Sequence, residues 1–146
     1  AIGLEALNEG VYWHTAIALR EAELCRIPFE VVDKLRERSL PVADQLIKQW
    51  EQYVLYADRW ITDLSSGPVR ARVYRMIRML VEIAGGDWHG VEMPSVDDLS
   101  AIVGTSPESV SRILAELKRG KVLKRVAPRT YDVDLEALAR AEAKDA

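Results

Sequence analysis

Three polar residues, Glu108, Ser111 and Arg112, share one face of a helix predicted over Pro107–Arg119. An arginine can donate two hydrogen bonds to O6 and N7 of a guanine, and a glutamate can accept one from the N4 amine of a cytosine. A small serine hydroxyl can approach a base edge closely. The spacing therefore predicts base reading in a DNA groove. The alternative is a solvated helix face with an ion pair between Glu108 and Arg112 at i, i+4.

The helix that carries these residues is the second of a predicted helix-turn-helix. Ser95 and Asp98 have the form of a capping box, which begins the first helix. Gly104 ends that helix, because glycine accepts the left-handed backbone conformation, and Ser106 caps the second helix. The second helix turns its apolar residues to the opposite face: Val110, Ile113, Leu114 and Leu117. Two short helices joined by a tight turn are the geometry that enters a major groove.

Residues around this helix are predicted to contact DNA phosphates. The N-terminus of a helix attracts anions, because its N–H groups are unpaired and the helix dipole is positive there, which favours Thr105 and Ser106. Basic side chains at the end of the helix and after it are further candidates: Arg119, Lys121, Lys124, Arg125 and Arg129.

Charge is segregated along the chain, although the net charge is only −3. Residues 1–68 sum to −4, residues 69–131 to +4 and residues 132–146 to −3. A basic segment between acidic ends favours one domain that meets a polyanion. The sequence has no Gly-rich phosphate loop, nucleophile motif or paired catalytic carboxylates, and we therefore expect no enzymatic activity.

The length and composition indicate the class of protein. The chain of 146 residues is long enough for one ordinary core. Its apolar runs are shorter than the roughly 20 residues of a membrane span, and no signal-peptide pattern opens it. One cysteine, Cys25, excludes an internal disulfide framework. We expect a cytoplasmic protein without a membrane partner and, because the pattern of ordered structure is already present at Ala1, part of a longer chain.

A long helix is predicted from Pro41 to Ser65. Its apolar residues keep a seven-residue repeat over three heptads, which is the signature of a coiled coil. The predicted dimer-interface residues are Ala43, Leu46, Trp50, Tyr53, Ala57, Trp60 and Leu64. The alternative is an amphipathic helix packed only on a β domain. Trp50 and Trp60 are large for a two-helix seam and could face such a domain instead.

Shorter elements are predicted on both sides of the long helix. Before it, Thr15–Leu19 and Glu23–Phe29 have the pattern of two strands joined by a turn at Arg20–Glu21, and Phe29–Leu35 that of a short helix. After it, small residues and a proline at Ser65–Pro68 predict a hinge.

The rest of the chain predicts a helical unit with a β-hairpin. Val69–Ala84 is expected to form a helix with a basic first half, and residues 90–93 a short strand. Behind the helix-turn-helix, Val122–Val126 and Tyr131–Val133 predict the hairpin known as a wing. Leu135–Ala143 is expected to be a short helix or a frayed tail.

This order of elements resembles the Crp/Fnr family of bacterial transcription regulators over nearly the whole chain. The resemblance is carried by ELCRIPFE at 23–30, by the long helix after Pro41, and by IVGTSPESVSRIL at 102–114 with the wing behind it. It implies a mainly α fold with a small β part. The implied parts are the end of a β-roll sensor (1–40), a coiled-coil dimerisation helix (41–66) and a winged helix-turn-helix DNA-binding domain (67–146).

Within the family the pattern is most similar to the Fnr-like branch, whose recognition helix carries Glu and, three and four residues later, Ser-Arg. Glu108, Ser111 and Arg112 occupy those positions here. The resemblance implies a homodimer bound to an inverted TTGAT-like repeat, with RNA polymerase as a further partner and with allosteric control by the sensor domain. The alternative is a coiled-coil dimer whose winged helix binds protein, which the basic segment argues against.

Two features of the N-terminal part concern the signal that the sensor domain would detect. Cyclic-nucleotide-binding members carry an Arg before a Ser/Thr-Ala pair, whereas residues 12–16 read Tyr-Trp-His-Thr-Ala, which counts against cAMP. In oxygen-sensing members a cysteine before Ile-Pro-Phe is a ligand of a [4Fe–4S] cluster, and Cys25 has that placement. Such a cluster needs four thiolates, so this chain would supply one; a buried structural cysteine is the alternative. His14 and His89 lack metal-ligand spacing.

Overall fold

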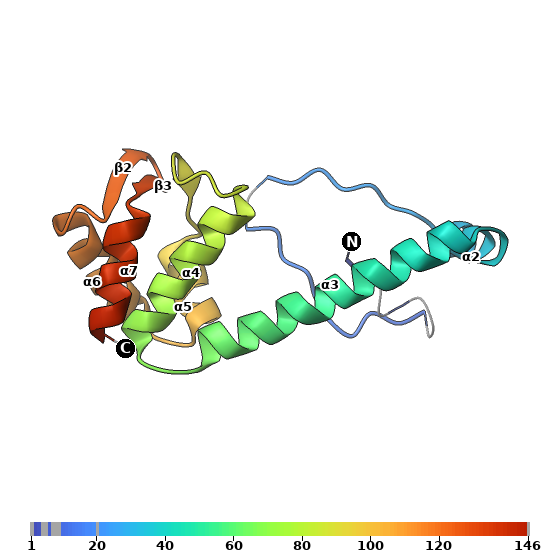
Figure 1. Cartoon of the computed structure of the whole chain (residues 1–146), viewed down its shortest axis with the longest axis horizontal. Coiled ribbons are helices and arrows are strands. Elements are labelled where there is room, and N and C mark those ends of the chain that lie inside the picture. The colour runs from blue at the N-terminus through green and yellow to red at the C-terminus, as the bar shows by residue number, and fades with distance from the viewer. Residues whose placement is uncertain (1, 4–5, 7–9, 20, 146) are drawn as a thin grey trace. The chain divides into compact units, whose positions relative to one another are not determined.

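The computed structural model describes residues 2–3, 6, 10–19 and 21–145. It is mainly helical with one small sheet, which confirms the predicted fold class (Figure 1). The chain divides into two compact units, Ala1–Asp58 and Arg59–Ala146.

The described part of the first unit contains α2 (Phe29–Arg38) and most of α3 (Leu40–Ser65). The start of α2 at Phe29 is as predicted, and the helix runs past the predicted end at Leu35. The predicted strands at Thr15–Leu19 and Glu23–Phe29 are wrong, because the described residues before α2 form no strand. A strand pairs its N–H and C=O groups with a neighbouring strand, and none lies in the described residues of this unit. Arg20, in the predicted turn, lies outside the described residues.

Helix α3 is continuous over 26 residues. Pro41 is its second residue, where the missing N–H would have no partner within the helix. Large apolar side chains are exposed along it: Leu40, Ile47, Trp50, Tyr53, Val54, Leu55, Tyr56 and Ile61. Apolar surface of this extent is typical of a helix that packs against another chain or domain. None of the helices in the described part of the chain has the length and apolar character needed to span a bilayer.

The second unit is a winged helix. Its helices and strands are α4 (Val69–Ile83), β1 (Val91–Glu92), α5 (Val96–Val103), α6 (Pro107–Arg119), β2 (Leu123–Ala127), β3 (Thr130–Val133) and α7 (Leu135–Asp145). The sheet order is β1-β3-β2 with antiparallel pairing throughout. Tyr131 pairs with Val91 on one side of β3, and Val133 pairs with Leu123 on the other. The predicted wing and the short strand before the helix-turn-helix are thereby confirmed.

One apolar core holds this unit together. Its largest fully buried side chains come from α4, α5, α6 and the sheet: Met76, Ile77, Val91, Val103, Val110 and Val133. Leu64, near the end of α3, is buried in the same core, and Trp60 packs against it. The last two turns of α3 therefore belong structurally to the winged helix.

The helix-turn-helix forms through local capping. The Ser95 hydroxyl accepts the Asp98 backbone N–H at 3.1 Å and donates to the Asp98 carboxylate at 2.6 Å, which begins α5. Gly104 ends α5 in the left-handed conformation, with φ +62°. Ser106 accepts the Ser109 backbone N–H at 3.3 Å, which begins α6. All three predicted boundary residues are confirmed.

The C-terminal segment is a packed helix rather than a frayed tail. Leu138 is 2% exposed and lies in the core of the winged helix. Glu142 accepts hydrogen bonds from Arg75 at 3.2 Å and from Arg78 at 2.8 Å, both on α4. The acidic α7 therefore neutralises part of the basic stretch that opens α4.

Replacing Gly104 with alanine should lower the free energy of unfolding by about 1–2 kcal/mol, because a Cβ disfavours the left-handed conformation. A clash is not the cause, since the nearest atom to that Cβ, Arg72 Nη1, is 3.9 Å away. Gly120→Ala is the matched control: Gly120 follows α6 with an ordinary φ of −74°, and we expect a change below about 0.5 kcal/mol. Urea titration of the two variants tests this. Equal losses would contradict the backbone explanation.

Ser106→Ala should destabilise the unit by about 1 kcal/mol, because it removes the acceptor for the first free N–H groups of α6. Ser111→Ala changes the same residue type on the same helix, at an exposed position away from the cap, and should be neutral within about 0.5 kcal/mol. Thermal unfolding of both variants without DNA measures the difference. A neutral Ser106→Ala would mean that the cap does not stabilise α6.

Candidate nucleic-acid interface

Helix α6 has one buried face and one exposed face. The apolar stripe is buried: Val110, Ile113, Leu114 and Leu117 are each 6% exposed or less. The side chains of Glu108, Ser111 and Arg112 are exposed. The predicted division of α6 into an inward and an outward face is therefore confirmed. The outward face carries two ionic groups and a hydroxyl within the first half of the helix, where a recognition helix contacts base edges.

Glu108 and Arg112 do not form an ion pair with each other in the described structure. The backbone N–H of Glu108 and the Ser106 hydroxyl instead stabilise the Glu108 carboxylate and lower its pKa. Glu108 therefore stays ionised at neutral pH, as an acceptor from a cytosine amine requires.

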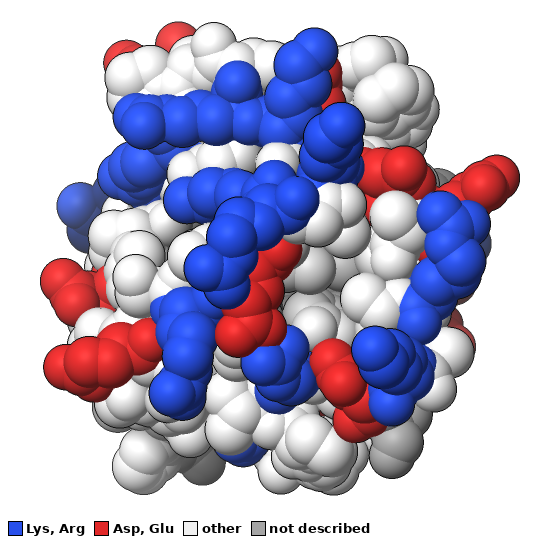
Figure 2. All heavy atoms as spheres, turned by 90° about the vertical axis from the view of Figure 1, so that its left-hand side faces the viewer, with Lys and Arg blue, Asp and Glu red and all other residues white. Residues whose placement is uncertain are grey.

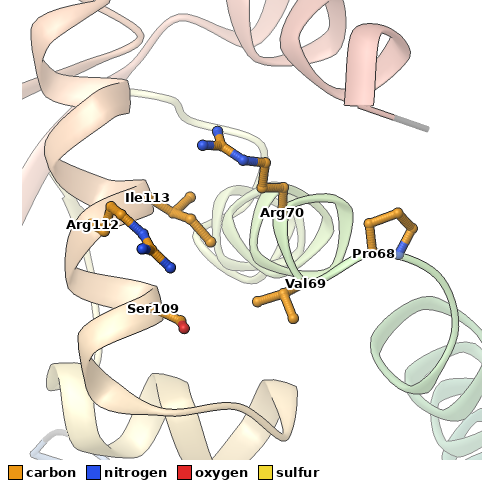
Figure 3. A pocket seen from close by; sticks show the side chains of 6 residues that line it. All are labelled: Pro68, Val69, Arg70, Ser109, Arg112 and Ile113. Atoms are coloured by element: carbon orange, nitrogen blue, oxygen red, sulfur yellow. The ribbon is translucent and has the colours of Figure 1, made fainter.

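A groove lies between the start of α4 and the side of α6 that carries Ser109 and Arg112 (Figure 3). Its volume is about 390 Å³, and it is lined by Pro68, Val69, Arg70, Ser109, Arg112 and Ile113. Figure 3 shows Ser109, Arg112 and Ile113 extending from α6 toward α4. The groove therefore places a predicted base-reading side chain, Arg112, beside a second arginine, Arg70.

Sequence reasoning did not single out Arg70 as a site residue. Its guanidinium contacts Glu116 of α6 at 2.5 Å and Asp145 of α7 at 3.8 Å. Hydrogen bonds with Tyr74 and Glu116 raise the pKa of Arg70, so it remains charged. The sequence signal was the basic first half of α4, but only the fold shows which of its arginines lines the groove.

The predicted phosphate contacts fall into two groups. At the turn before α6, the Ser106 hydroxyl caps the helix, and the Thr105 backbone N–H donates to the Ser100 carbonyl at 3.0 Å. In the second group, at the end of α6 and in the wing, all five side chains are exposed: Arg119, Lys121, Lys124, Arg125 and Arg129. Lys121 and Arg129 have φ of +59°, and Arg129 Nε donates to the Met93 carbonyl at 3.0 Å.

Lysine and arginine side chains gather on one face of this unit. Figure 2 shows them running in a band across the face that carries α6 and the wing, with acidic side chains interspersed and toward the edges. Such a surface attracts a polyanion over several phosphates rather than at one point.

Cys25 and His89 belong to different compact units. Cys25 is exposed in the described structure, and its role, as a cluster ligand or as a structural cysteine, stays a prediction. His89 lies against Trp88, with ring centroids 3.5 Å apart, and 3.5 Å from Asp132 in the second unit. No group of three or more metal-ligating side chains occurs in the described part of the chain. An iron–sulfur cluster therefore does not fit these residues alone, since Cys25 is one thiolate where four are needed.

The predicted dimer-interface residues differ in environment. Trp50, Tyr53 and Ala57 are exposed. Ala43 and Leu46 are half-buried. Leu64 is 3% exposed in the core of its own subunit, so its assignment to the dimer seam is wrong. The heptad pattern continues to Leu64 because one apolar stripe serves the exposed middle of α3 and the core contact at its end.

Comparison with known proteins agrees with this geometry. Residues 74–141 match the Crp-like helix-turn-helix domain. The chain is 30% identical over 141 residues to the transcriptional regulator LdrP of Thermus thermophilus, covering 94% of this chain and 69% of LdrP.

Solved structures share the fold. FixK2 from Bradyrhizobium japonicum superposes with a TM-score of 0.69 at 19% identity, over 80% of this chain and 59% of that one. TTHB099, a transcriptional regulator of the CRP family from Thermus thermophilus, gives a TM-score of 0.59 at 20% identity, over 72% of this chain and 55% of that one. This chain thus spans less than two thirds of these solved relatives.

The matched domain contains α5, α6 and the wing, and the match to LdrP extends over nearly all 146 residues. The chain therefore belongs to the Crp family of transcriptional regulators and carries a helix-turn-helix DNA-binding domain.

Proposed function

We propose that this chain acts as a homodimeric, sequence-specific regulator that places α6 of each subunit in a major groove of an inverted repeat. The observation that carries the proposal is the outward face of α6, where Glu108, Ser111 and Arg112 are exposed together beside a basic wing. The buried opposite face fixes which side chains point outward, and side chains held by a rigid scaffold can read bases.

Each of the three side chains has a separate role in this proposal. Arg112 donates two hydrogen bonds to a guanine, and ionised Glu108 accepts one from a cytosine amine. Ser111 contacts a base edge or a thymine methyl. The order Glu, then Ser-Arg, supports a TTGAT-like half-site of the Fnr-like branch. Exposed Arg119, Lys121 and the wing arginines bind phosphates and set the register without reading sequence.

Helix α3 supplies the two-fold partner in this proposal. Its middle exposes aromatic and aliphatic side chains at heptad spacing, among them Trp50 and Tyr53. Two copies of the helix would bury this surface against each other, and the dimer would place two α6 helices about one DNA turn, roughly 34 Å, apart.

We propose that a sensor domain controls this dimer. RNA polymerase is proposed as a further partner at promoters. A more specific proposal is that the sensor domain responds to oxygen or redox state through an iron–sulfur cluster. Cys25 is the only cysteine of this chain, so three ligands would have to come from other residues.

Arg112→Ala should reduce binding to a duplex with an inverted TTGAT-like repeat by about 1–3 kcal/mol per half-site contact, because it removes a bidentate base contact. Binding to scrambled DNA of equal length should change much less. Fluorescence anisotropy titrations on both duplexes measure the two losses.

Arg119→Ala is the matched control for this test. Arg119 lies on the same helix but is predicted to contact phosphate, so its loss should weaken both duplexes equally and reduce the slope of log K against log salt by about 1 per subunit. Equal losses on both duplexes for Arg112→Ala would contradict base reading. A wild-type protein that binds the two duplexes alike would favour a winged helix that binds protein.

Tyr53→Lys should convert the dimer to a monomer, because it places a charge in the predicted seam of α3. Asp58→Lys introduces the same side chain at an exposed position outside the heptad core and should leave the dimer intact. Sedimentation velocity of the two variants distinguishes the species. A Tyr53→Lys protein that sediments like the wild type would place the interface elsewhere.

A further inference from the structure

One arginine forms hydrogen bonds across the junction between α3 and α4. Arg75, on α4, donates from Nη1 to the backbone carbonyl of Asp63 at 2.9 Å and to that of Ser66 at 3.1 Å. These carbonyls lie at the C-terminal end of α3, where the last four C=O groups have no partner within the helix and the helix dipole is negative. A cation from the following helix therefore caps the preceding one, across the segment Ser65–Pro68.

The same guanidinium also binds a third group. Arg75 Nε donates to Glu142 of α7 at 3.2 Å, and the two side chains are only 19% and 18% exposed. A guanidinium is planar and rigid, so three bonds in different directions fix its orientation. Arg75 thus connects the end of α3, the middle of α4 and α7 through one side chain.

The backbone of the junction is shaped to receive this side chain. Gly67 has φ +83°, and a Cβ at that position would lie 3.3 Å from Arg75 Nη2. A side chain there would be strained by the backbone and would crowd the guanidinium. Ser66 adds a local hydrogen bond at the end of α3: its hydroxyl donates to the Thr62 carbonyl at 2.6 Å.

A second contact between α3 and α4 is more exposed. Arg59 pairs with Glu82 at 2.6 Å, but the side chains are 41% and 45% exposed. Exposed pairs are screened by water and salt and contribute little. The half-buried Arg75 is therefore the stronger constraint on how the end of α3 meets α4.

We propose that Arg75 is a positioning residue for DNA recognition: it fixes the junction between α3 and the winged helix, and thereby the separation of the two recognition helices in the dimer. The inference rests on the proposed function, a dimer on an inverted repeat. With Arg75 bound to the α3 carbonyls, the dimer accepts one half-site spacing. Without it, Ser65–Pro68 becomes a flexible hinge and several spacings are accepted.

Two variants serve as matched controls for Arg75→Gln. Arg78→Gln removes an arginine of α4 that contacts the same Glu142 but makes no hydrogen bond to α3. Glu142→Gln removes the ion pair and leaves both carbonyl bonds of Arg75 in place. Arg75→Lys keeps the charge but cannot reproduce the planar fork, and it provides a second test if Arg75→Gln fails to fold.

The first measurement is amide hydrogen exchange of residues 62–68 in the whole chain without DNA. Arg75→Gln should accelerate exchange by about tenfold or more, because charge-assisted bonds no longer hold the junction closed. Arg75→Lys should give a smaller rise, and Arg78→Gln and Glu142→Gln should stay within about twofold of the wild type. Unchanged exchange in Arg75→Gln and Arg75→Lys would overturn the inference.

The second measurement is affinity for duplexes whose half-site separation is altered by one or two base pairs. The wild type should prefer one separation, and Arg75→Gln should lose that preference while binding a single half-site as before. A general structural defect would instead weaken half-site binding too. Retained spacing preference in Arg75→Gln would overturn the inference. If the wild type does not prefer the repeat over scrambled DNA, the proposed function fails, and the exchange result still decides whether Arg75 holds the junction.

Discussion

The burial of one face of α6 is the constraint on which the DNA-binding unit depends. Val110, Ile113, Leu114 and Leu117 enter a core shared with α4, α5 and the sheet. Because these four residues lie at helical spacing, burying them leaves no freedom in the rotation of the helix about its axis. The direction of Glu108, Ser111 and Arg112 follows from that packing. Under the proposed function, specificity toward bases would therefore depend on the buried face of α6, whose side chains do not contact DNA.

Electrostatics in this unit is arranged so that some arginines stabilise the fold and others remain for a ligand. Arg75 and Arg78 share the carboxylate of Glu142, and Arg70 contacts Glu116 and Asp145. The basic side chains at the end of α6 and in the wing are exposed instead. The positive charge of residues 69–131 is therefore partly neutralised where α7 packs on α4 and is left accessible on the face shown in Figure 2.

Local signals in the sequence predicted most of the winged helix, and contacts between distant residues were not predictable. Ser95, Gly104 and Ser106 act within one turn of chain, so their capping roles can be read from residue type and spacing. The contact of Arg75 with Glu142 joins residues 67 apart, and no periodicity encodes it. The burial of Leu64 in its own core was missed for the same reason. The predicted strands before α2 failed because a strand is defined by its partner, which a single segment does not specify.

The packing of Trp60 and Leu64 has a mechanical consequence. The boundary between the two compact units falls after Asp58, inside an unbroken helix, and not at the small residues 65–68. A helix is stiff to twisting because each turn is held by hydrogen bonds to the next. Rotation of α3 about its axis would therefore move the Leu64 side chain within the apolar core. Because the core is close-packed, its side chains would have to repack in discrete steps. The packing of Leu64 and Trp60, together with the hydrogen bonds of Arg75, would resist such a rotation.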